Sequence, residues 1–428
     1  MQQSRKSPVR QPLSILVALF GTEGDMRPLI WFAQGMAARG HRITAHVNPR
    51  YRALADAHGW RVIELGTIDD FNNVLDDPRI WVPVEGTQLV FDAMLRAYPM
   101  YRESLDAANE RFDLAVGTVL ASGALAWAQS KGAARIMAAL QPLGLRSAYD
   151  CPLYAPSLAW LVHMPPWLLR ALFRMSDAFG AREILRPLNE HRRALALPPL
   201  QTFEHLVRDA DAIAALFPAW LAAVQPDWPP QLTQLGFPWP PGESPPLDAT
   251  VERFLERGEA PIVWTHGSAN VDVERFMTGA REATRALRMR GIFVGPGSDT
   301  SDNFIAIAHA PFERLLPRCR AIVHHAGIGT AMHAFAAGIP QLLVPRAHDQ
   351  FDNAWRVART GVGTRMRYES FSADRAARAL RTMLDSEDVR VACSRTRELM
   401  RANDPLAALC DLAEAVAERS ALQLDLGA

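Results

Sequence analysis

The chain has 428 residues, of which 49% are hydrophobic and 21% charged, and its 46 Lys and Arg equal its 46 Asp and Glu. This length exceeds what one hydrophobic core usually holds, so we expect two domains of roughly 200 residues each. The balanced charge excludes the basic excess that a polyanionic partner such as nucleic acid would favour.

The cysteines and the apolar stretches bear on the cellular compartment. Four cysteines stand far apart without a C-x-x-C pair, which predicts neither a zinc cluster nor a disulfide framework and favours the cytoplasm. The chain starts with basic residues before an apolar run, as a signal peptide does, but the run is short and no small-residue cleavage site follows. We therefore expect a disordered tail and then a strand. No apolar stretch reaches the roughly 20 residues that span a bilayer.

The first half of the chain alternates short apolar runs with helical patterns. Pro28 is expected to open a helix that ends at Gly40, because proline favours the first helical position and glycine the position past the end. Short continuous apolar runs are typical of parallel strands buried on both faces. The expected strands are SILVALF (14–20), RITAHV (42–47), RVIEL (61–65), DLAVGTV (113–119) and RIMAAL (135–140), with a helix over RYRALADAHG (50–59).

Prolines are concentrated between residues 226 and 246, where they cannot continue helices or central strands. We therefore predict an N-terminal domain over 1–232, a linker over 233–248 and a C-terminal domain over 249–428, whose last helices brace the domains. The predicted fold class is α/β with two doubly wound Rossmann-like domains, and ligands then bind in the cleft at the carboxyl ends of the strands. Strands of the second domain are expected in PIVWTHGS (261–268), GIFVG (291–295), AIVHH (321–325) and QLLVP (341–345).

A glycine-rich turn follows the strand AIVHH. The turn AGIGT leads into TAMHAFAAG (330–338), which reads as a helix ending at Gly338. Unpaired N–H groups and the positive end of the helix dipole meet at such a turn and favour a phosphate. His324 and His325 can add side-chain donors, and the hydroxyl of Thr330 can cap the helix or bind the phosphate. By itself a turn of this kind is more often only a turn.

Two further loops lie at the same edge of the predicted sheet. In RAHDQFDN (346–353), Asp349 and Gln350 could bridge neighbouring hydroxyls of a sugar attached to the phosphate. THGS (265–268) follows another strand, and it is equally well explained as a helix start capped by Ser268.

At these residues the chain resembles the glycosyltransferases with two Rossmann-like domains (the GT-B fold), in the family that contains macrolide, glycopeptide, sterol and plant natural-product transferases. The family motif H-H-G-G-x-G-T, then G-x-P, then D-Q-x-x-N appears here as HHAGIGT, GIP and DQFDN. The similarity covers nearly the whole chain. Within the family, the runs LFPAW, QPDWPPQL, GFP and AHDQFDNA are similar to the B-type rhamnosyltransferase subunits of rhamnolipid synthesis.

The resemblance implies a nucleotide-sugar donor, which is a co-substrate, and no cofactor. AHAPF (308–312) occupies the W-x-P-Q position of the family, with His309 in place of the aromatic residue and Phe312 in place of the glutamine. Ala326 stands where glycine is usual, and its methyl group is tolerated if φ is negative. The implied donor-binding residues are Gly267, Ser268, His309, Phe312, His324, His325, Gly327, Ile328, Gly329, Thr330, Asp349 and Gln350.

The catalytic base is expected in the first loop of the N-terminal domain. Bacterial members of the family often carry G-x-x-G-D-x-x-P there, and this chain has GTEGDMRP (21–28), which implies Asp25 as the base. Taken alone, Asp25 would fit a first-turn acid of the helix that follows. The implied reaction is a direct, inverting displacement without a metal ion. The acidic triplet DAD (209–211), which imitates a metal-binding D-x-D, is interpreted as a solvated strand start.

The acceptor is less clearly encoded. Residues 152–173 are rich in Trp, Leu and Pro, so they suit a lipid site, a membrane contact or ordinary helix packing. We expect Trp160, Trp167 and Thr22 to contact the acceptor. The rhamnolipid resemblance implies dTDP-L-rhamnose as donor, a 3-(3-hydroxyalkanoyloxy)alkanoic acid as acceptor, and mono-rhamnolipid as product.

Alternatives and partners remain open at this point. The chain could glycosylate a polyketide, a sterol or another small aglycone, be a non-catalytic helper of the same fold, or be a nucleotide-sugar epimerase. We expect no nucleic-acid partner. A peripheral contact with the inner membrane and a partner subunit that makes the acceptor are both compatible with the sequence.

Overall fold

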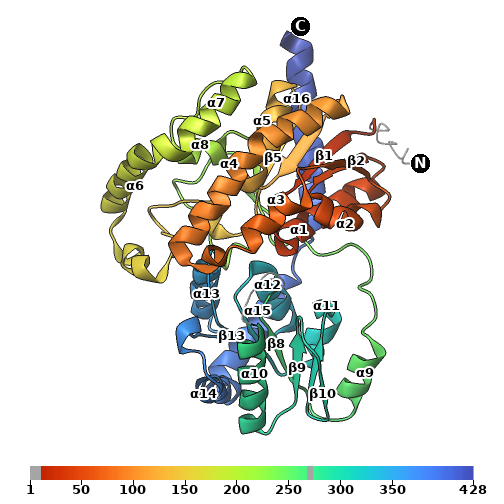
Figure 1. Cartoon of the computed structure of the whole chain (residues 1–428), viewed down its shortest axis with the longest axis vertical. Coiled ribbons are helices and arrows are strands. Elements are labelled where there is room, and N and C mark those ends of the chain that lie inside the picture. The colour runs from red at the N-terminus through yellow and green to blue at the C-terminus, as the bar shows by residue number, and fades with distance from the viewer. Residues whose placement is uncertain (1–10, 268–272, 428) are drawn as a thin grey trace, which may run out of the picture.

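The computed structural model describes residues 11–267 and 273–427. Figure 1 shows two α/β domains, one above the other along the long axis of the molecule. Within the described residues, each domain contains one seven-stranded sheet. The fold class predicted from the sequence, two doubly wound parallel sheets, is confirmed.

The N-terminal sheet has the order β3-β2-β1-β4-β5-β6-β7, and all its pairs are parallel. β1 lies between β2 and β4 in the interior of the sheet, with every residue from Ile15 to Leu19 buried, as expected for a strand covered on both faces. The strands are β1 (Ser14–Leu19), β2 (Arg42–Val47), β3 (Arg61–Glu64), β4 (Leu114–Gly117), β5 (Ala134–Ala139), β6 (Ala212–Ala215) and β7 (Leu232–Gln234).

The C-terminal sheet has the order β10-β11-β9-β8-β12-β13-β14. Its pairs are parallel except for β10 and β11, which form an edge hairpin that the sequence analysis did not predict. The strands are β8 (Ile262–Thr265), β9 (Gly291–Val294), β10 (Asp299–Ser301), β11 (Phe304–Ile307), β12 (Ala321–His324), β13 (Gln341–Leu343) and β14 (Gly363–Arg365).

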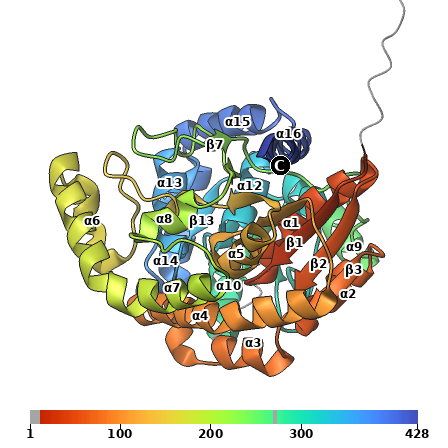
Figure 2. The ribbon, with the colours of Figure 1, turned by 90° about the horizontal axis from the view of Figure 1, so that it is seen from above.

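Helices cover both sheets (Figures 1 and 2). Those of the N-terminal domain are α1 (Glu23–Ala38), α2 (Arg52–Asp56), α3 (Ile68–Leu75), α4 (Pro83–Ala108), α5 (Ser122–Ser130), α6 (Pro166–Gly180), α7 (Arg186–Ala194) and α8 (Phe203–Arg208). Those that follow are α9 (Ala249–Glu256), α10 (Val273–Leu287), α11 (Phe312–Leu315), α12 (Ile328–Ala337), α13 (Gln350–Arg359), α14 (Ala373–Leu384), α15 (Glu387–Met400) and α16 (Pro405–Gly427).

The last helix, α16, packs on the N-terminal domain. Its apolar residues share a buried cluster with β1 and α1, and Arg39, which directly follows α1, forms an ion pair of 2.7 Å with Asp411. Figure 1 shows α16 running beside the N-terminal sheet. A second buried cluster joins Trp31 of α1 to Phe335 of α12, so apolar packing connects the two domains directly.

Helix α1 begins five residues earlier than the proline rule predicts. It starts at Glu23, and Pro28 lies inside it. The polar loop residues themselves form the first turn, because the Asp25 carboxylate accepts hydrogen bonds from Thr22 that stabilise the N-terminus. The sequence prediction of Pro28 as the helix start was therefore wrong, and the change brings Asp25 to the tip of the helix.

Candidate active site in the interdomain cleft

A cavity of about 1530 Å³ lies between the domains. Residues that directly follow β1, β2 and β5 line it from the N-terminal side, and residues that follow β8, β9 and β12 line it from the C-terminal side. The carboxyl ends of both parallel sheets therefore face the same space, which is where open α/β sheets bind ligands.

Asp25 stands at the N-terminal wall of this cavity. Its Oδ2 atom accepts the backbone N–H of Thr22 at 2.8 Å and the Thr22 hydroxyl at 2.9 Å. Gly21 has φ +110°, and a Cβ atom there would lie 2.6 Å from Oδ2, so the loop needs glycine to seat the carboxylate. Burial raises the pKa of Asp25, although the two bonds from Thr22 oppose the rise. Asp25 thus caps α1 and also presents a carboxylate of raised basicity to the cavity.

The glycine-rich turn lies opposite, at the start of α12. Gly327 is the N-cap, and Ile328, Gly329 and Thr330 form the first turn and line the cavity. The first intrahelical bond runs from Ala331 N–H to the Gly327 carbonyl at 3.0 Å, so the preceding N–H groups have no intrahelical acceptor. These N–H groups and the helix dipole create a site for an anion.

The two adjacent histidines have different environments. His324 ends β12 and is fully buried; its Nδ1 atom accepts the N–H of Ala326 at 3.2 Å, and its Nε2 atom lies 3.0 Å from Oε1 of Gln341. His324 does not belong to the cavity lining, whereas His325 does. The prediction of a direct phosphate contact therefore suits His325 and not His324. A side chain at the end of a strand that points into the core cannot also reach the cleft.

His325 lines the cavity beside the glycine-rich turn. Its Nδ1 atom is buried without a hydrogen-bond partner among the described residues. Its ring leaves no room for a side chain at Gly327, where a Cβ atom would lie 2.6 Å from Nε2. Burial, together with the neighbouring His324 and His266, lowers the pKa of His325 to about 3. The imidazole is therefore neutral at physiological pH and acts as a hydrogen-bonding group, so the positive potential here comes from α12.

Asp349 and Gln350 lie at the start of α13 and line the cavity beside the turn. Oδ2 of Asp349 accepts from Asn353 at 2.7 Å, and Oε1 of Gln350 accepts the N–H groups of Arg346 and Ala347 at 2.9 and 3.2 Å. The Gln350 oxygen is thus used within its own loop, and the amide nitrogen is the end of the side chain left for a ligand.

Asn353 connects this loop with the glycine-rich turn. Its amide nitrogen also donates to the carbonyl of Ala326 at 3.0 Å. Ala326 has φ +68° and is fully buried. The condition of a negative φ, on which its tolerance was predicted, is not met, so the Asn353 bond holds a residue in a conformation that costs an L-residue about 1 kcal/mol. Asn353 falls within the D-Q-x-x-N motif, and that spacing was the signal for this role.

The third part of the C-terminal wall is aromatic. His309 and Phe312 line the cavity, and Phe312 lies 6.1 Å from the ring of His333 on α12. His333 also contacts Trp239 of the linker at 5.1 Å and places an unpartnered, buried Nδ1 atom at this end of the cavity. Sequence reasoning missed His333. Its position three residues after Thr330, on the same side of α12, could have indicated it.

The predicted acceptor residues are divided. Thr22 lines the cavity, but Trp160 and Trp167 do not, and their exposed fractions are 49% and 70%. Helical geometry explains the difference, because the inner face of this segment is occupied by other residues. The residues of this segment that line the cavity are Tyr154, Leu158, Leu161, Leu172 and Phe173. The predicted site residue Ser268 lies outside the described residues, and Gly267 lines the cavity.

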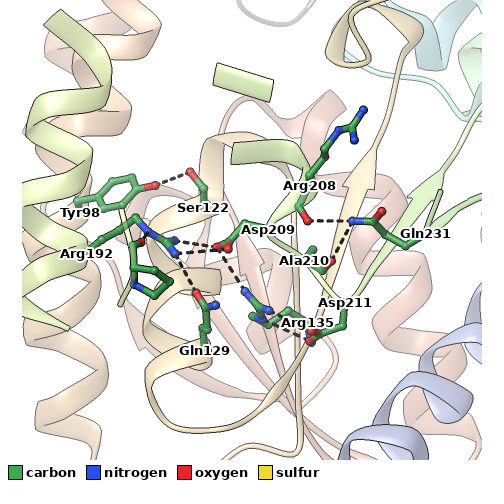
Figure 3. A network of polar contacts seen from close by, with 11 residues as sticks. Tyr98, Ser122, Gln129, Arg135, Arg192, Arg208, Asp209, Ala210, Asp211 and Gln231 are labelled. Carbon is green, nitrogen blue, oxygen red and sulfur yellow. Dashed lines mark hydrogen bonds and ion pairs between the residues drawn. The ribbon is translucent and has the colours of Figure 1, made fainter. Parts of the chain in front are cut away.

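The acidic triplet before β6 is occupied by arginines (Figure 3). Asp209 accepts from Arg192 at 2.7 Å, and Asp211 accepts from Arg135 at 3.0 Å. Arg192 and Arg135 are both buried, so these carboxylates neutralise charges inside the domain. The interpretation as a merely solvated strand start was incomplete. Within the described parts of the chain, no group of three or more His, Cys, Asp or Glu is arranged to hold a metal ion.

Two Rossmann-like domains with a cavity between them are the features of the GT-B fold. Residues 297–413 match the family described as "Erythromycin biosynthesis protein CIII-like, C-terminal domain". The chain is 28% identical over 380 residues to glycosyltransferase GtfE of Amycolatopsis orientalis, covering 82% of this chain and 85% of that protein. It is 26% identical over 436 residues to O-mycaminosyltylonolide 6-deoxyallosyltransferase of Streptomyces fradiae, covering 95% and 98% of the two chains.

Solved structures agree on the fold. The calicheamicin glycosyltransferase CalG4 superposes with a TM-score of 0.70 and 21% identity, covering 96% of this chain and 99% of that one. The spinosyn rhamnosyltransferase SpnG gives a TM-score of 0.65 and 19% identity, covering 94% and 100%. The chain is thus similar in sequence to glycopeptide and macrolide glycosyltransferases, and similar in fold to solved GT-B structures. None of the helices in the described residues is long and apolar enough to cross a bilayer.

Proposed function

We propose that this protein is an inverting glycosyltransferase that moves a sugar from a nucleoside diphosphate to a hydroxyl group of an acceptor. One observation carries the proposal: the carboxylate of Asp25 and the N-terminus of α12 line the same cavity from opposite domains. A base and an anion site that face each other across one cavity suit a displacement at a carbon atom bound between them.

The reaction proceeds in one step. Asp25 accepts the proton of the acceptor hydroxyl while the acceptor oxygen forms a bond to the anomeric carbon from the face opposite the diphosphate. The bond from that carbon to the diphosphate oxygen breaks, and its electron pair leaves with the nucleoside diphosphate. The N–H groups of α12, the hydroxyl of Thr330 and the ring of His325 stabilise the added charge. No metal ion is required in this scheme.

Asp349 and Gln350 hold the sugar. They lie at the start of α13 beside the phosphate turn, so a sugar attached to a phosphate at α12 reaches them. His309, Phe312 and His333 form the aromatic end of the cavity, which suits a nucleobase.

We propose dTDP-L-rhamnose as the donor. The sequence runs shared with rhamnolipid rhamnosyltransferases support this choice. Among the structural neighbours, one is the spinosyn rhamnosyltransferase SpnG, and another, VinC, is a glycosyltransferase in complex with DTDP. VinC superposes with a TM-score of 0.67 at 17% identity, covering 95% of this chain and 100% of that one.

The acceptor we propose is a 3-(3-hydroxyalkanoyloxy)alkanoic acid. The N-terminal part of the cavity has a long apolar wall, which suits acyl chains better than a compact polar aglycone. That wall consists of Phe91, Leu120, Leu143, Leu158, Leu161, Leu172, Phe173, Ile184 and Val207. A polyketide or other small aglycone remains the second candidate, because two of the similar proteins are named for O-mycaminosyltylonolide and for spinosyn.

Combining several donors with several acceptors tests both the glycosyl transfer itself and the proposed choice of substrates. The purified protein is incubated with dTDP-L-rhamnose, dTDP-glucose or UDP-glucose and with the hydroxyalkanoyloxy acid, a sterol or a macrolide aglycone, and products are identified by mass spectrometry. We expect a rhamnosylated acid only in the first combination, and none with Asp25→Asn. A glycosylated macrolide or sterol would show that the hydroxyalkanoyloxy acid is not the acceptor. The absence of transfer from every donor would refute the proposed activity.

A further inference from the structure

Helix α6 has two faces of different character. Figures 1 and 2 both show it at the outer edge of the N-terminal domain. Leu172 and Phe173 on its inner side line the acceptor part of the cavity, and Leu169 is buried in a small cluster beneath it. α6 is therefore a thin wall between the cavity and the surroundings of the protein.

The outer face of α6 is apolar and basic. Trp167 and Met175 have exposed fractions of 70% and 56%, which are high for large apolar side chains. Arg170 and Arg174 are exposed on the same arc of the helix, because the positions 167, 170, 174 and 175 are spaced for one helical face. We call Trp167, Arg170, Arg174 and Met175 the α6 patch.

Acidic groups do not offset this charge on the outer face. The acid of α6, Asp177, forms a bidentate pair with Arg146 at 2.8 and 2.8 Å and lines the cavity instead. Arg170 stacks at 4.8 Å on the ring of Tyr149, whose exposed fraction of 47% extends the aromatic surface. In the described residues, no acidic side chain pairs with Arg174.

We infer that the α6 patch docks on an anionic lipid surface, so that α6 admits an apolar acceptor from the bilayer to the cavity behind it. An exposed tryptophan beside a flexible apolar side chain and two arginines is the arrangement that interfacial helices use: the apolar groups enter the headgroup layer, and the cations pair with lipid phosphates. A protein partner would have to present acidic groups at positions that match the two arginines. An anionic lipid surface carries phosphates over its whole area, so the arginines find partners there in any position.

The purpose of this docking rests on the proposed acyl acceptor, but the docking itself does not. A hydroxyalkanoyloxy acid is an amphiphile that partitions into membranes. A helix with one face in the bilayer surface and the other on the cavity shortens the path of this acceptor to the Asp25 carboxylate. Vesicle binding needs neither donor nor turnover, so its outcome is separate from the outcome for glycosyl transfer.

The test is sedimentation of the full chain with vesicles of phosphatidylcholine alone or mixed equally with phosphatidylglycerol. We expect binding to the mixed vesicles that falls with salt and is weak on phosphatidylcholine. Arg174→Gln should weaken it about fivefold, the change that corresponds to one arginine near an anionic surface. Trp167→Ser should weaken it about tenfold through the lost apolar area.

Matched controls come from the C-terminal domain. Arg378→Gln removes an exposed arginine of α14, and Val391→Ser removes a side chain of α15 with an exposed fraction of 55%. Both should bind vesicles as the unchanged chain does. The inference is overturned if the unchanged chain stays in the supernatant with mixed vesicles, or if Trp167→Ser and Arg174→Gln bind no differently from the controls. Thermal melts confirm folding, and Arg174→Gln decides the result if Trp167→Ser is destabilised.

Discussion

Asp25 and Asp349 come from different domains and interact across the cleft. Burial and, after it, the negative charge of Asp25 raise the pKa of Asp349 to about 7. Two carboxyl groups that are close and buried resist double ionisation, so near neutral pH Asp349 carries a proton for much of the time. A protonated Asp349 can donate a hydrogen bond to a sugar hydroxyl.

The role of Asp25 is tested by Asp25→Asn. The amide can still accept from Thr22 and cap α1, but it cannot take the acceptor proton, so kcat should fall by roughly 10²–10⁴-fold. Donor affinity and the melting temperature should stay close to those of the unchanged chain. A folded variant with nearly normal turnover would show that Asp25 only caps the helix.

Asp349→Asn should change the pH dependence of stability. The pKa of Asp349 rises from 3.8 to about 7 on folding, so the native state binds this proton more tightly and loses stability as pH rises through that window. The variant should therefore be more stable than the unchanged chain at pH 8, by about 4 kcal/mol, and close to it in stability near pH 4. Urea unfolding at both pH values measures this. The exposed Asp92→Asn is the control, and equal stabilities at pH 8 would contradict the raised pKa.

Substitutions of the two adjacent histidines should affect different properties, stability in one case and nucleotide binding in the other. His324→Ala leaves Oε1 of Gln341 and the Ala326 N–H without partners in the core, so the free energy of unfolding should fall by about 2–4 kcal/mol. His325→Ala should change it little but weaken dTDP binding by about 1–3 kcal/mol, the range for a hydrogen bond to a charged group. Chemical unfolding and calorimetry give the two values. The reverse pattern would return the phosphate contact to His324.

A buried ion network fastens α13 to the N-terminal domain and should matter for stability. Arg356, almost fully buried, pairs with Asp352 at 2.8 Å and with Asp150 at 2.5 Å, while Asp352 accepts the N–H of Leu153 at 2.9 Å across the domain boundary. Arg356→Met leaves Asp352 without a counter-charge and should cost about 3–5 kcal/mol of unfolding free energy.

The matched control for this network is Arg359→Met. Arg359 also approaches Asp150, at 3.9 Å, but its side chain is 60% exposed, so we expect a change below about 1 kcal/mol. Equal losses in the two variants, measured by urea unfolding, would show that burial of Arg356 is not what gives the network its strength.

Transfer should not depend on divalent cations. In the proposed reaction the N–H groups of α12 and the Thr330 hydroxyl stabilise the leaving diphosphate, and the acidic triplet is paired with Arg135 and Arg192. Turnover in excess chelator should therefore equal turnover with added magnesium. Loss of activity in chelator and its recovery with magnesium or manganese would require a metal ion at the diphosphate.

The sequence by itself determined the fold class and the loops that carry the site. Continuous apolar runs separated by helical patterns specify buried parallel strands, and the order of strand and helix places the following loops at one edge of the sheet. The glycines at the start of α12, the Asp-Gln pair and Asp25 could be located for this reason, since each lies in the connection from a strand to the next helix or in the first turn of that helix. The run GTEGDMRP also indicated both positions of Asp25, in the first turn of a helix and beside the cleft.

Only the tertiary structure decided which side chains of those loops face the cavity. His324 and His325 are neighbours in sequence, but one ends a buried strand and the other leaves it, so packing assigns one to the core and one to the cleft. Trp160 and Trp167 belong to an apolar segment whose composition does not say which helical face turns inward. The pKa of Asp349 is raised first by burial and then by the charge of Asp25, which stands more than 300 residues away in the chain. Such effects arise because burial and charge act through space, and local sequence patterns carry no information about residues that folding brings together from afar.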